Sequence, residues 1–309
     1  MAACRDKSKL LAHYSGEVRV GDLRDPDYLD RVLVGIDIVC HTAGWSSFEK
    51  SGDTCNKTYL EPTLDLINHA IEWRIKRFVN LSSLYTSKPN KRDNADIAGK
   101  PRAYWPMMNC LIAVEDYLRA YTSSRTQFVN LRLGIYSGKR INMGLLPLLL
   151  ARNNHSSMPY LTGSLGHLPL IDGKDIGQAF IRAALAPIEA NFSNLNICGP
   201  ETPSHFEVMQ FIKEQTQHSP LSYGLPTPFA NFILWSQSKF QRFEYQPLLT
   251  SAMIDMLKSP LISNQQAKEN LGFDPEVSWK ASLLDTLDAY KNQSINTNLS
   301  QPSNNLNLN

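Results

Sequence analysis

The sequence predicts an α/β fold in which a doubly wound parallel sheet carries helices on both faces. Short, nearly continuous apolar runs rich in β-branched residues alternate with amphipathic stretches of helical length. Continuous apolar runs are typical of strands buried on both faces, and alternation of strands with helices builds βαβ units around a parallel sheet. The 309 residues suffice for one domain with an added lobe or for two domains.

The predicted elements follow one another in a regular order. Strands are expected at residues 17–20, 36–42, 77–83, 127–133 and 195–198, and helices at residues 27–34, 59–73, 104–121 and 175–185, the last with Asp175 as its N-cap. Ligands of such sheets bind where the strands end, so functional residues are expected directly after the strands.

The residue composition and patterning of the chain change after about residue 200. Prolines at positions 220, 226 and 228 alternate with aromatic helical stretches, which predicts a smaller C-terminal lobe over residues 201–291 that contacts the substrate. From Asn292 onward no periodicity remains, which predicts a disordered tail over residues 292–309. Residues 1–200 are predicted to form the main α/β domain.

Composition and charge narrow the possible partners. The net charge is +2, and the absence of a basic stripe with interleaved aromatic residues argues against nucleic acid. The five cysteines have no C-x-x-C or metal-ligand spacing, so no metal is expected and the thiols suit a reducing compartment. No segment has the form of a signal peptide or of a run of about 20 apolar residues. We therefore expect a cytoplasmic protein without a transmembrane span.

An ordered series of short segments carries a resemblance to a known family. The segments are GDLRD (Gly21–Asp25), DIVCHTAG (Asp37–Gly44), FVNLSS (Phe78–Ser83), Tyr104, NLRLG (Asn130–Gly134) and AKENLGFDP (Ala267–Pro275). Over residues 3–290 the chain resembles the extended short-chain dehydrogenase/reductase superfamily, in its NAD-dependent epimerase/dehydratase group. It is most similar to the branch of 3β-hydroxysteroid dehydrogenases and dihydroflavonol reductases.

This resemblance implies a Rossmann-like fold and an NAD(P)-dependent oxidoreductase acting on an alcohol or ketone. The cofactor is NADP or NAD, bound by residues 1–200. The resemblance places Asp22 and Leu23 at the adenine, and Ala43 and Gly44 where the backbone approaches the cofactor closely. Arg5 stands where family members that prefer NADP often have an arginine for the 2′-phosphate.

The resemblance also implies the catalytic residues. Ser83 matches the serine that hydrogen-bonds the substrate carbonyl or hydroxyl, and Tyr104 matches the tyrosine that passes the proton. Leu133 falls where the family often has a proline beside the nicotinamide. Taken alone, Ser83 also suits a strand-end cap and Tyr104 a packing residue at a helix start.

Two departures from the family pattern bear on activity. Family members open with a strand, the loop G-x-G-x-x-G and a helix. In this sequence Met1–Leu10 already resembles the second strand of the family. The Rossmann-like sheet is therefore expected to lack its first βα unit and to expose strand edges. In the family motif Y-x-x-x-K, Met108 takes the lysine position. A thioether neither binds a ribose nor favours ionisation of a phenol, whose ordinary pKa is about 10. We expect poor NAD(P) binding and slow or no turnover.

Several hypotheses for the function stay open at this stage. Trp45, Phe48, Trp105 and Met107 suit either an apolar, steroid-like substrate or the core. The alternatives are a nucleotide-sugar epimerase or dehydratase, a catalytically inactive relative with a binding or interaction role, and a start of the protein that lies upstream. Family members often dimerise through helices like those at residues 59–73 and 104–121, so a homodimer is a further expectation.

Overall fold

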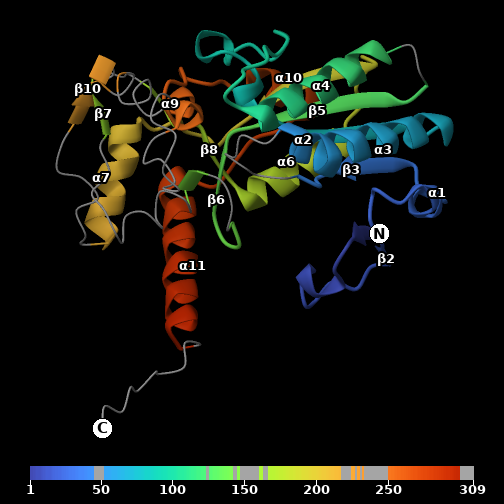
Figure 1. The fold of residues 1–309 in the computed structure, drawn as a ribbon, viewed down its shortest axis with the longest axis horizontal. Helices are drawn as coiled ribbons and strands as arrows, with labels where there is room; N and C mark the ends of the chain where they lie inside the picture. The colour runs from blue at the N-terminus through green and yellow to red at the C-terminus, as the bar shows by residue number, and fades with distance from the viewer. Residues whose placement is uncertain are drawn as a thin grey trace. The chain divides into compact units, whose positions relative to one another are not determined.

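The computed structural model describes residues 1–44, 52–122, 125–141, 145–146, 160–162, 166–216, 224–226, 228–229, 232 and 250–299, with backbone alone at 160–162, 224–225 and 292–299. The chain forms two compact units (Figure 1). The first unit contains Met1–Leu133, Gln178–Ile197 and Ser263–Phe273. The second contains Gly134–Gly177, Cys198–Ile262 and Asp274–Asn309.

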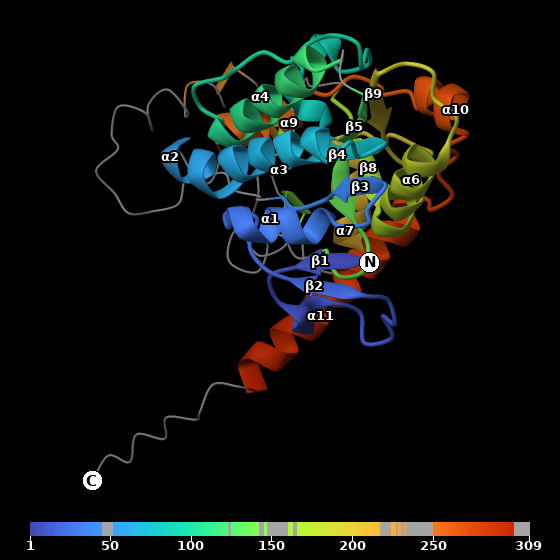
Figure 2. The same cartoon turned by 90° about the vertical axis from the view of Figure 1, so that its right-hand side faces the viewer.

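A four-stranded parallel sheet forms the centre of the first unit (Figure 2). Its strand order is β3 (Ile38–His41), β4 (Arg77–Ser83), β5 (Gln127–Leu133) and β9 (Phe192–Ile197). The strands predicted at residues 77–83 and 127–133 are confirmed to the residue. Phe78, Val79, Phe128 and Val129 are fully buried, as expected where helices cover both faces of a parallel sheet.

A separate parallel pair holds β1 (Ala2–Cys4) and β2 (Val18–Val20). Among the described residues, β1 pairs only with β2 and β3 only with β4, so each presents an unpaired edge. In the doubly wound order 3-2-1-4-5-6, one central strand lies between strands equivalent to β1 and β3. The observed pairing matches that order without its central strand, and Cys40 on β3 and Val20 on β2 are exposed.

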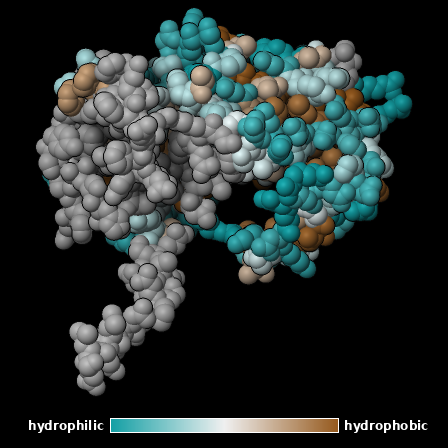
Figure 3. Space-filling view, in the orientation of Figure 1, coloured by the Kyte–Doolittle hydropathy of each residue, from teal (hydrophilic) through white to brown (hydrophobic). Residues whose placement is uncertain are grey.

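Helices cover the sheet of the first unit. They are α1 (Pro26–Leu33), α2 (Gly52–Cys55), α3 (Glu61–Glu72), α4 (Pro106–Ala120) and α10 (Gln265–Leu271), with 3₁₀ turns η1 (Lys7–Lys9), η3 (Leu84–Thr86) and η4 (Pro89–Lys91) and a π turn η2 (Asn56–Leu60). α6 (Gly173–Leu185) runs from the second unit into the first. α3 and α4 lie side by side on one face of the sheet, with α6 on the other (Figure 2). On the face drawn in Figure 3, hydrophobic and hydrophilic residues are interspersed over the described part of this unit.

Three predicted helix starts differ from the structure. The helix predicted from Tyr104 begins at Pro106, because a residue before proline avoids the α conformation and Trp105 is accordingly at φ −140° and ψ 74°. The helix predicted from Tyr59 is preceded by α2 and η2, which extend it toward the N-terminus. Asp175 is not an N-cap, because α6 begins at Gly173.

The second unit is built from short strands and helices. β6 (Ile135–Ser137) pairs with β8 (Leu170–Asp172), and β7 (Tyr160–Thr162) pairs with β10 (Gly224–Pro226). Its helices are α7 (His205–Thr216), α9 (Ser251–Met256) and α11 (Trp279–Leu299). Within the described residues, no helix of either unit is long and apolar enough to cross a membrane.

The unit boundaries differ from a single division near residue 200. Residues 134–177 belong to the second unit and residues 263–273 to the first, because the chain leaves the sheet after β5, returns for β9 and returns again with α10. Within the stretch from Asn292 that was predicted to be a disordered tail, α11 continues to Leu299. Leu283 and Leu287 are buried and anchor α11, and extending an established helix costs far less than starting one.

Candidate functional site

The carboxyl ends of β1 and β2 bring Arg5, Asp22 and Leu23 together in the first unit. The Asp22 carboxylate accepts hydrogen bonds from Arg24 Nε at 3.0 Å and Arg24 Nη2 at 2.6 Å. These bonds, aided by the nearby charge of Arg5, lower the pKa of Asp22 to about 2. Asp22 is therefore a carboxylate at neutral pH, and its oxygens already bind Arg24.

Ser83 and Leu133 lie opposite each other at the ends of β4 and β5. Ser83 Oγ accepts a hydrogen bond from the backbone N–H of Tyr85 at 3.3 Å, so Ser83 caps the turn η3. Ser83 is 9% exposed, and the Leu133 side chain is fully buried. The cap accounts for Ser83 structurally, and its contact with a substrate stays a prediction.

Ala43 and Gly44 follow β3 and are both exposed. Among the described residues, a Cβ on Gly44 would meet only the carbonyl oxygen of Thr42, at 3.9 Å. The backbone here is thus accessible to a ligand, although the Gly44 conformation does not demand glycine. Trp45 and Phe48, which come next, lie outside the described residues.

Tyr104 and Met108 do not form an i, i+4 pair on α4. Tyr104 lies in the turn before the helix and is 41% exposed, whereas Met108 is buried in its first turn. The buried i, i+4 pairs at the start of α4 are Met107 with Leu111 and Met108 with Ile112. None of these four side chains is a phenol or an ammonium.

No other residues of α4 supply a tyrosine and a lysine four positions apart. α4 contains no lysine from Pro106 to Ala120. Its one tyrosine, Tyr117, lies near the far end of the helix and donates a hydrogen bond to Asn68 Oδ1 at 2.5 Å. The nearby cation Arg102 donates to the carbonyl oxygens of Tyr85 and Ser87 at 2.5 and 2.6 Å, so it is already held by the backbone.

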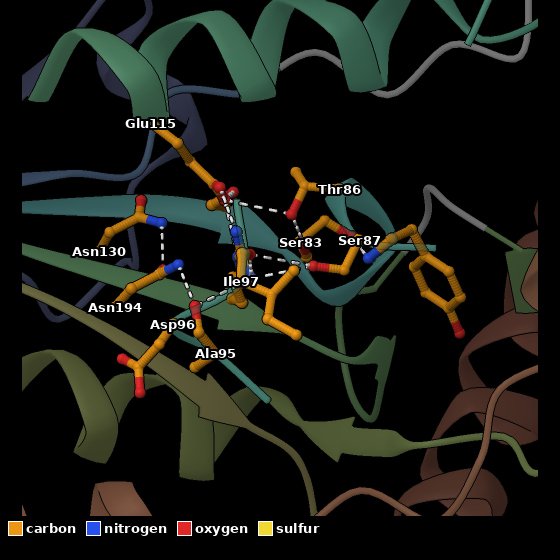
Figure 4. Close-up of polar contacts among 12 residues, drawn as sticks. Ser83, Thr86, Ser87, Ala95, Asp96, Ile97, Glu115, Asn130 and Asn194 are labelled. Atoms are coloured by element: carbon orange, nitrogen blue, oxygen red, sulfur yellow. Dashed lines mark hydrogen bonds and ion pairs between the residues drawn. The ribbon is translucent and has the colours of Figure 1, made fainter. Parts of the chain in front are cut away.

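A buried ion pair that the sequence reasoning missed joins β5 to α4, and Figure 4 labels its carboxylate, Glu115. Arg132 on β5 and Glu115 on α4 are each 1% exposed and meet at 2.5 Å. Glu115 Oε1 also accepts hydrogen bonds from Ser82 Oγ at 2.5 Å and Thr86 Oγ1 at 3.2 Å. The sequence held a signal for this pair, because Arg132 is a charged residue within a mostly apolar strand and Glu115 lies on the apolar face of a helix. Charged residues at such positions are buried only when they are paired.

The same network fixes the segment that follows Ser83. Arg132 Nη1 donates to Ser87 Oγ and to the carbonyl oxygens of Ala95 and Ile97 at 3.0 to 3.1 Å. Amide side chains form a ladder across the sheet, from Asn80 to Asn130 to Asn194 and on to the Ala95 carbonyl (Figure 4 shows its last two steps). The pair and the ladder therefore hold residues 84–97 against the sheet.

His41, at the end of β3, is buried and neutral. Its Nε2 lies 3.2 Å from Thr63 Oγ1, and its ring stacks on that of Tyr59. Burial lowers the pKa of His41 to about 4. His41 is therefore uncharged at neutral pH and belongs to the packing between β3 and α3. In the part of the chain that the structure describes, no cluster of three or more His, Cys, Asp or Glu residues is placed to hold a metal ion.

The apolar candidates Trp105 and Met107 are core residues. They are 3% and 7% exposed, and Trp105 packs against Tyr85 with ring centroids 6.0 Å apart. Of the two interpretations that the sequence left open for these residues, burial in the core is the one that the structure supports.

The parallel sheet and the polar residues at its strand ends define an α/β protein of the doubly wound, nucleotide-binding class. The chain belongs to the NAD dependent epimerase/dehydratase family, whose model matches residues 2–198. No curated protein matches the sequence.

Solved structures of low sequence identity share the fold. The Bordetella bronchiseptica enzyme WbmG in complex with NAD is 16% identical with a TM-score of 0.66, covering 95% of this chain and 86% of WbmG. A Thermotoga maritima UDP-glucose 4-epimerase with UDP-glucose is 15% identical, TM-score 0.68, with coverage of 94% and 90%. The Thermus thermophilus UDP-glucose 4-epimerase with NAD is 18% identical, TM-score 0.66, with coverage of 93% and 88%.

The residues present do not fit the pyrophosphate of the family's cofactor. That group rests on a helix N-terminus behind a glycine-rich loop, and the sequence contains no G-x-G-x-x-G. Among the described residues, the turns after β1 and β2 begin with Asp6 and Asp25, which accept the N–H groups of Ser8 and Asp27. These carboxylates satisfy the helix ends and repel a phosphate. Among the described residues we find no cradle for the cofactor phosphates, and contact of Asp22 and Leu23 with its adenine stays a prediction.

Proposed function

We propose that this chain is a binding member of the NAD dependent epimerase/dehydratase family that turns substrate over slowly or not at all. One observation carries the proposal: α4 has no lysine, and the one tyrosine near its start precedes the helix and is exposed. A phenol with a pKa near 10 is a poor base at neutral pH without a neighbouring cation. General acid–base catalysis contributes about 10²–10⁴-fold, so a loss of this size is expected.

We infer the class of ligand from the family, and not from the apolar residues that had suggested a steroid-like substrate. Trp105 and Met107 are part of the core, which removes half of the support for a steroid-like substrate. Solved neighbours were crystallised with NAD, with NAD and UDP, and with UDP-glucose. We infer that a small nucleotide-containing molecule is the ligand, recognised at the strand ends that carry Asp22 and Ser83.

A second candidate is an active nucleotide-sugar epimerase or dehydratase, and the neighbours named above favour it. It differs from the first proposal in requiring a bound nicotinamide cofactor and a proton-transfer group. The two candidates are separated by measuring binding and turnover on the same protein.

Calorimetric titration of NADH, NADPH and UDP-glucose into the purified 309-residue chain is the first test. A version extended at its N-terminus by the strand, glycine-rich loop and helix of a family member is the matched control. We expect no micromolar NAD(P) binding by the chain alone, binding by the extended version, and no turnover by either. Micromolar NADH or NADPH binding by the chain alone, or epimerisation of UDP-glucose by the extended version, would overturn the proposal.

A further inference from the structure

Two strand edges of the first unit are unpaired among the residues that the structure describes. β1 pairs only with β2, and β3 pairs only with β4. Figure 2 shows the pair of β1 and β2 apart from the four-stranded sheet. Because the doubly wound order has one strand between β1 and β3, we name this position the β1–β3 gap.

Backbone groups of β1 point into the β1–β3 gap. The Ala2 N–H donates to the Glu17 carbonyl at 2.8 Å, and the Cys4 carbonyl accepts from the Gly21 N–H at 3.1 Å, so these two residues of β1 bind on the β2 side. Neighbouring residues of a strand direct their backbone groups to opposite edges, and the N–H and C=O of Ala3 therefore point away from β2. Such groups are a template for a further strand.

β3 presents two residues in the same way. The Asp37 carbonyl accepts hydrogen bonds from the Lys76 N–H at 2.8 Å and from the Arg77 N–H at 3.4 Å, both on the β4 side. Ile38 and Cys40 therefore direct their N–H and C=O groups away from β4. The two edges together offer the backbone groups that a strand between them needs on both of its sides.

Helices cover one face of the gap. Arg19 of β2 donates to the Val32 carbonyl of α1 at 2.8 Å, and His41 of β3 contacts Thr63 of α3. α1 and α3 pack against each other, so this face is already occupied. A helix that accompanies an added strand has to lie on the opposite face.

Apolar side chains are exposed on that opposite face. Side chains of a strand alternate between the faces of a sheet, so Val20, next to Arg19, and Cys40, next to His41, point away from α1 and α3. Val20 is 55% exposed, and Cys40 is exposed as well. The residue of β4 that pairs with Cys40 is Val79, which is fully buried. The exposure of apolar side chains on this face therefore accompanies the gap.

We propose that the β1–β3 gap docks a strand–helix segment of a separate polypeptide chain. The strand adds between β1 and β3, parallel to both, and the helix lies over Val20 and Cys40. A strand at this position is buried on both faces, so it is a continuous apolar run without proline. The helix has one apolar side toward the sheet and one polar side toward solvent.

Other occupants fit this gap less well. A strand alone leaves Val20 and Cys40 exposed. A second copy of this chain offers β1 and β3 as its own free edges, and each of these strands carries a paired neighbour, so neither enters a position that is one strand wide. Docking of the segment needs neither nucleotide nor turnover, so it goes beyond the function proposed above and is tested separately from it.

Calorimetric titration of a peptide into the whole 309-residue chain, without nucleotide, tests the proposal. The peptide carries the strand, glycine-rich loop and helix of a family member. We expect saturable, equimolar binding. The same peptide with a proline in the middle of its strand is the matched control, because proline cannot donate a hydrogen bond to a neighbouring strand. We expect its affinity to be lower by about tenfold or more.

Hydrogen exchange locates the bound peptide. Proteolytic fragments that contain β1 and β3 should exchange more slowly when the peptide is bound, because the N–H groups of Ala3, Ile38 and Cys40 acquire acceptors. β5 and β9 are not neighbours of the gap, and their exchange should not change.

Two variants distinguish the gap from the rest of the surface. Cys40→Asp places a carboxylate under the docked helix and should weaken binding by about tenfold or more, because burying a charge without a partner is unfavourable. Tyr121→Asp places the same charge at the end of α4, where Tyr121 is 39% exposed, and should leave the affinity unchanged. Circular dichroism checks the folding of both variants, and the proline control does not depend on them.

Three results would overturn the proposal. In the first, the peptide does not bind. In the second, the proline peptide binds the chain, or the peptide binds a folded Cys40→Asp chain, as tightly as the peptide binds the unaltered chain. In the third, the chain sediments as a dimer in which β1 and β3 already exchange slowly without the peptide, which means that a second copy occupies the two edges.

Discussion

Replacing Glu115 with alanine leaves the guanidinium of Arg132 buried without its counter-charge. Arg132 is 1% exposed and donates from Nε at 3.0 Å and from Nη2 at 2.5 Å to the two Glu115 oxygens. Breaking one partner of a buried ion pair costs about 3–5 kcal/mol, and the lost acceptor for Ser82 Oγ adds about 1 kcal/mol or more. Local relaxation offsets part of this sum. We expect the free energy of unfolding to fall by about 4 kcal/mol, a large part of the roughly 5–15 kcal/mol typical of a domain.

Urea denaturation followed by tryptophan fluorescence measures this loss. A double-mutant cycle with Arg132→Ala isolates the pairwise coupling, and the apolar double variant Glu115→Leu with Arg132→Met should recover most of the stability. Asp37→Asn is the matched control, because the Lys76–Asp37 pair at 3.0 Å has side chains 76% and 70% exposed and should contribute about 1 kcal/mol or less. A loss for Glu115→Ala no larger than that of the control refutes the argument.

Two further predictions concern stability. Folded His41 stays neutral down to a pH of about 4, whereas an unfolded histidine binds its proton near 6.5, so the unfolded state binds more protons between these values and stability falls by up to about 3 kcal/mol as the pH drops through that window. Urea melts across the window should show a shallower slope for His41→Asn, and an unchanged slope would contradict the assignment. A Cβ on Gly134 would lie 2.1 Å from the Pro169 carbonyl oxygen, whereas one on Gly177 in α6 meets nothing described within 4 Å. Thermal melts should show Gly134→Ala destabilised by about 1–3 kcal/mol and Gly177→Ala stabilised by up to about 1 kcal/mol; equal effects would refute the packing argument.

Parts of the fold were predictable because local pattern decides them. β4 and β5 match their predicted bounds, since both contain a Phe-Val-Asn-Leu segment whose Phe, Val and Leu side chains suit a strand of a parallel sheet. The helix predicted at residues 104–121 begins two residues later, at Pro106. The helical pattern of the sequence includes residues 104 and 105, but a residue before proline avoids the helical conformation. This difference bears on function, because the catalytic prediction placed Tyr104 on the helix, whereas Tyr104 precedes it.

The sequence by itself determined the parallel α/β architecture, the family, and the absence of a lysine from residues 106–120, since each depends on residue type and local spacing. Only the tertiary structure decided that Tyr104 is exposed, that Ser83 caps a turn and that, among the described residues, β1 and β3 each pair on one side only. The physical reason is the range of the interactions. Periodicity fixes which face of an element is apolar, whereas pairing between residues far apart in the chain depends on how whole elements pack.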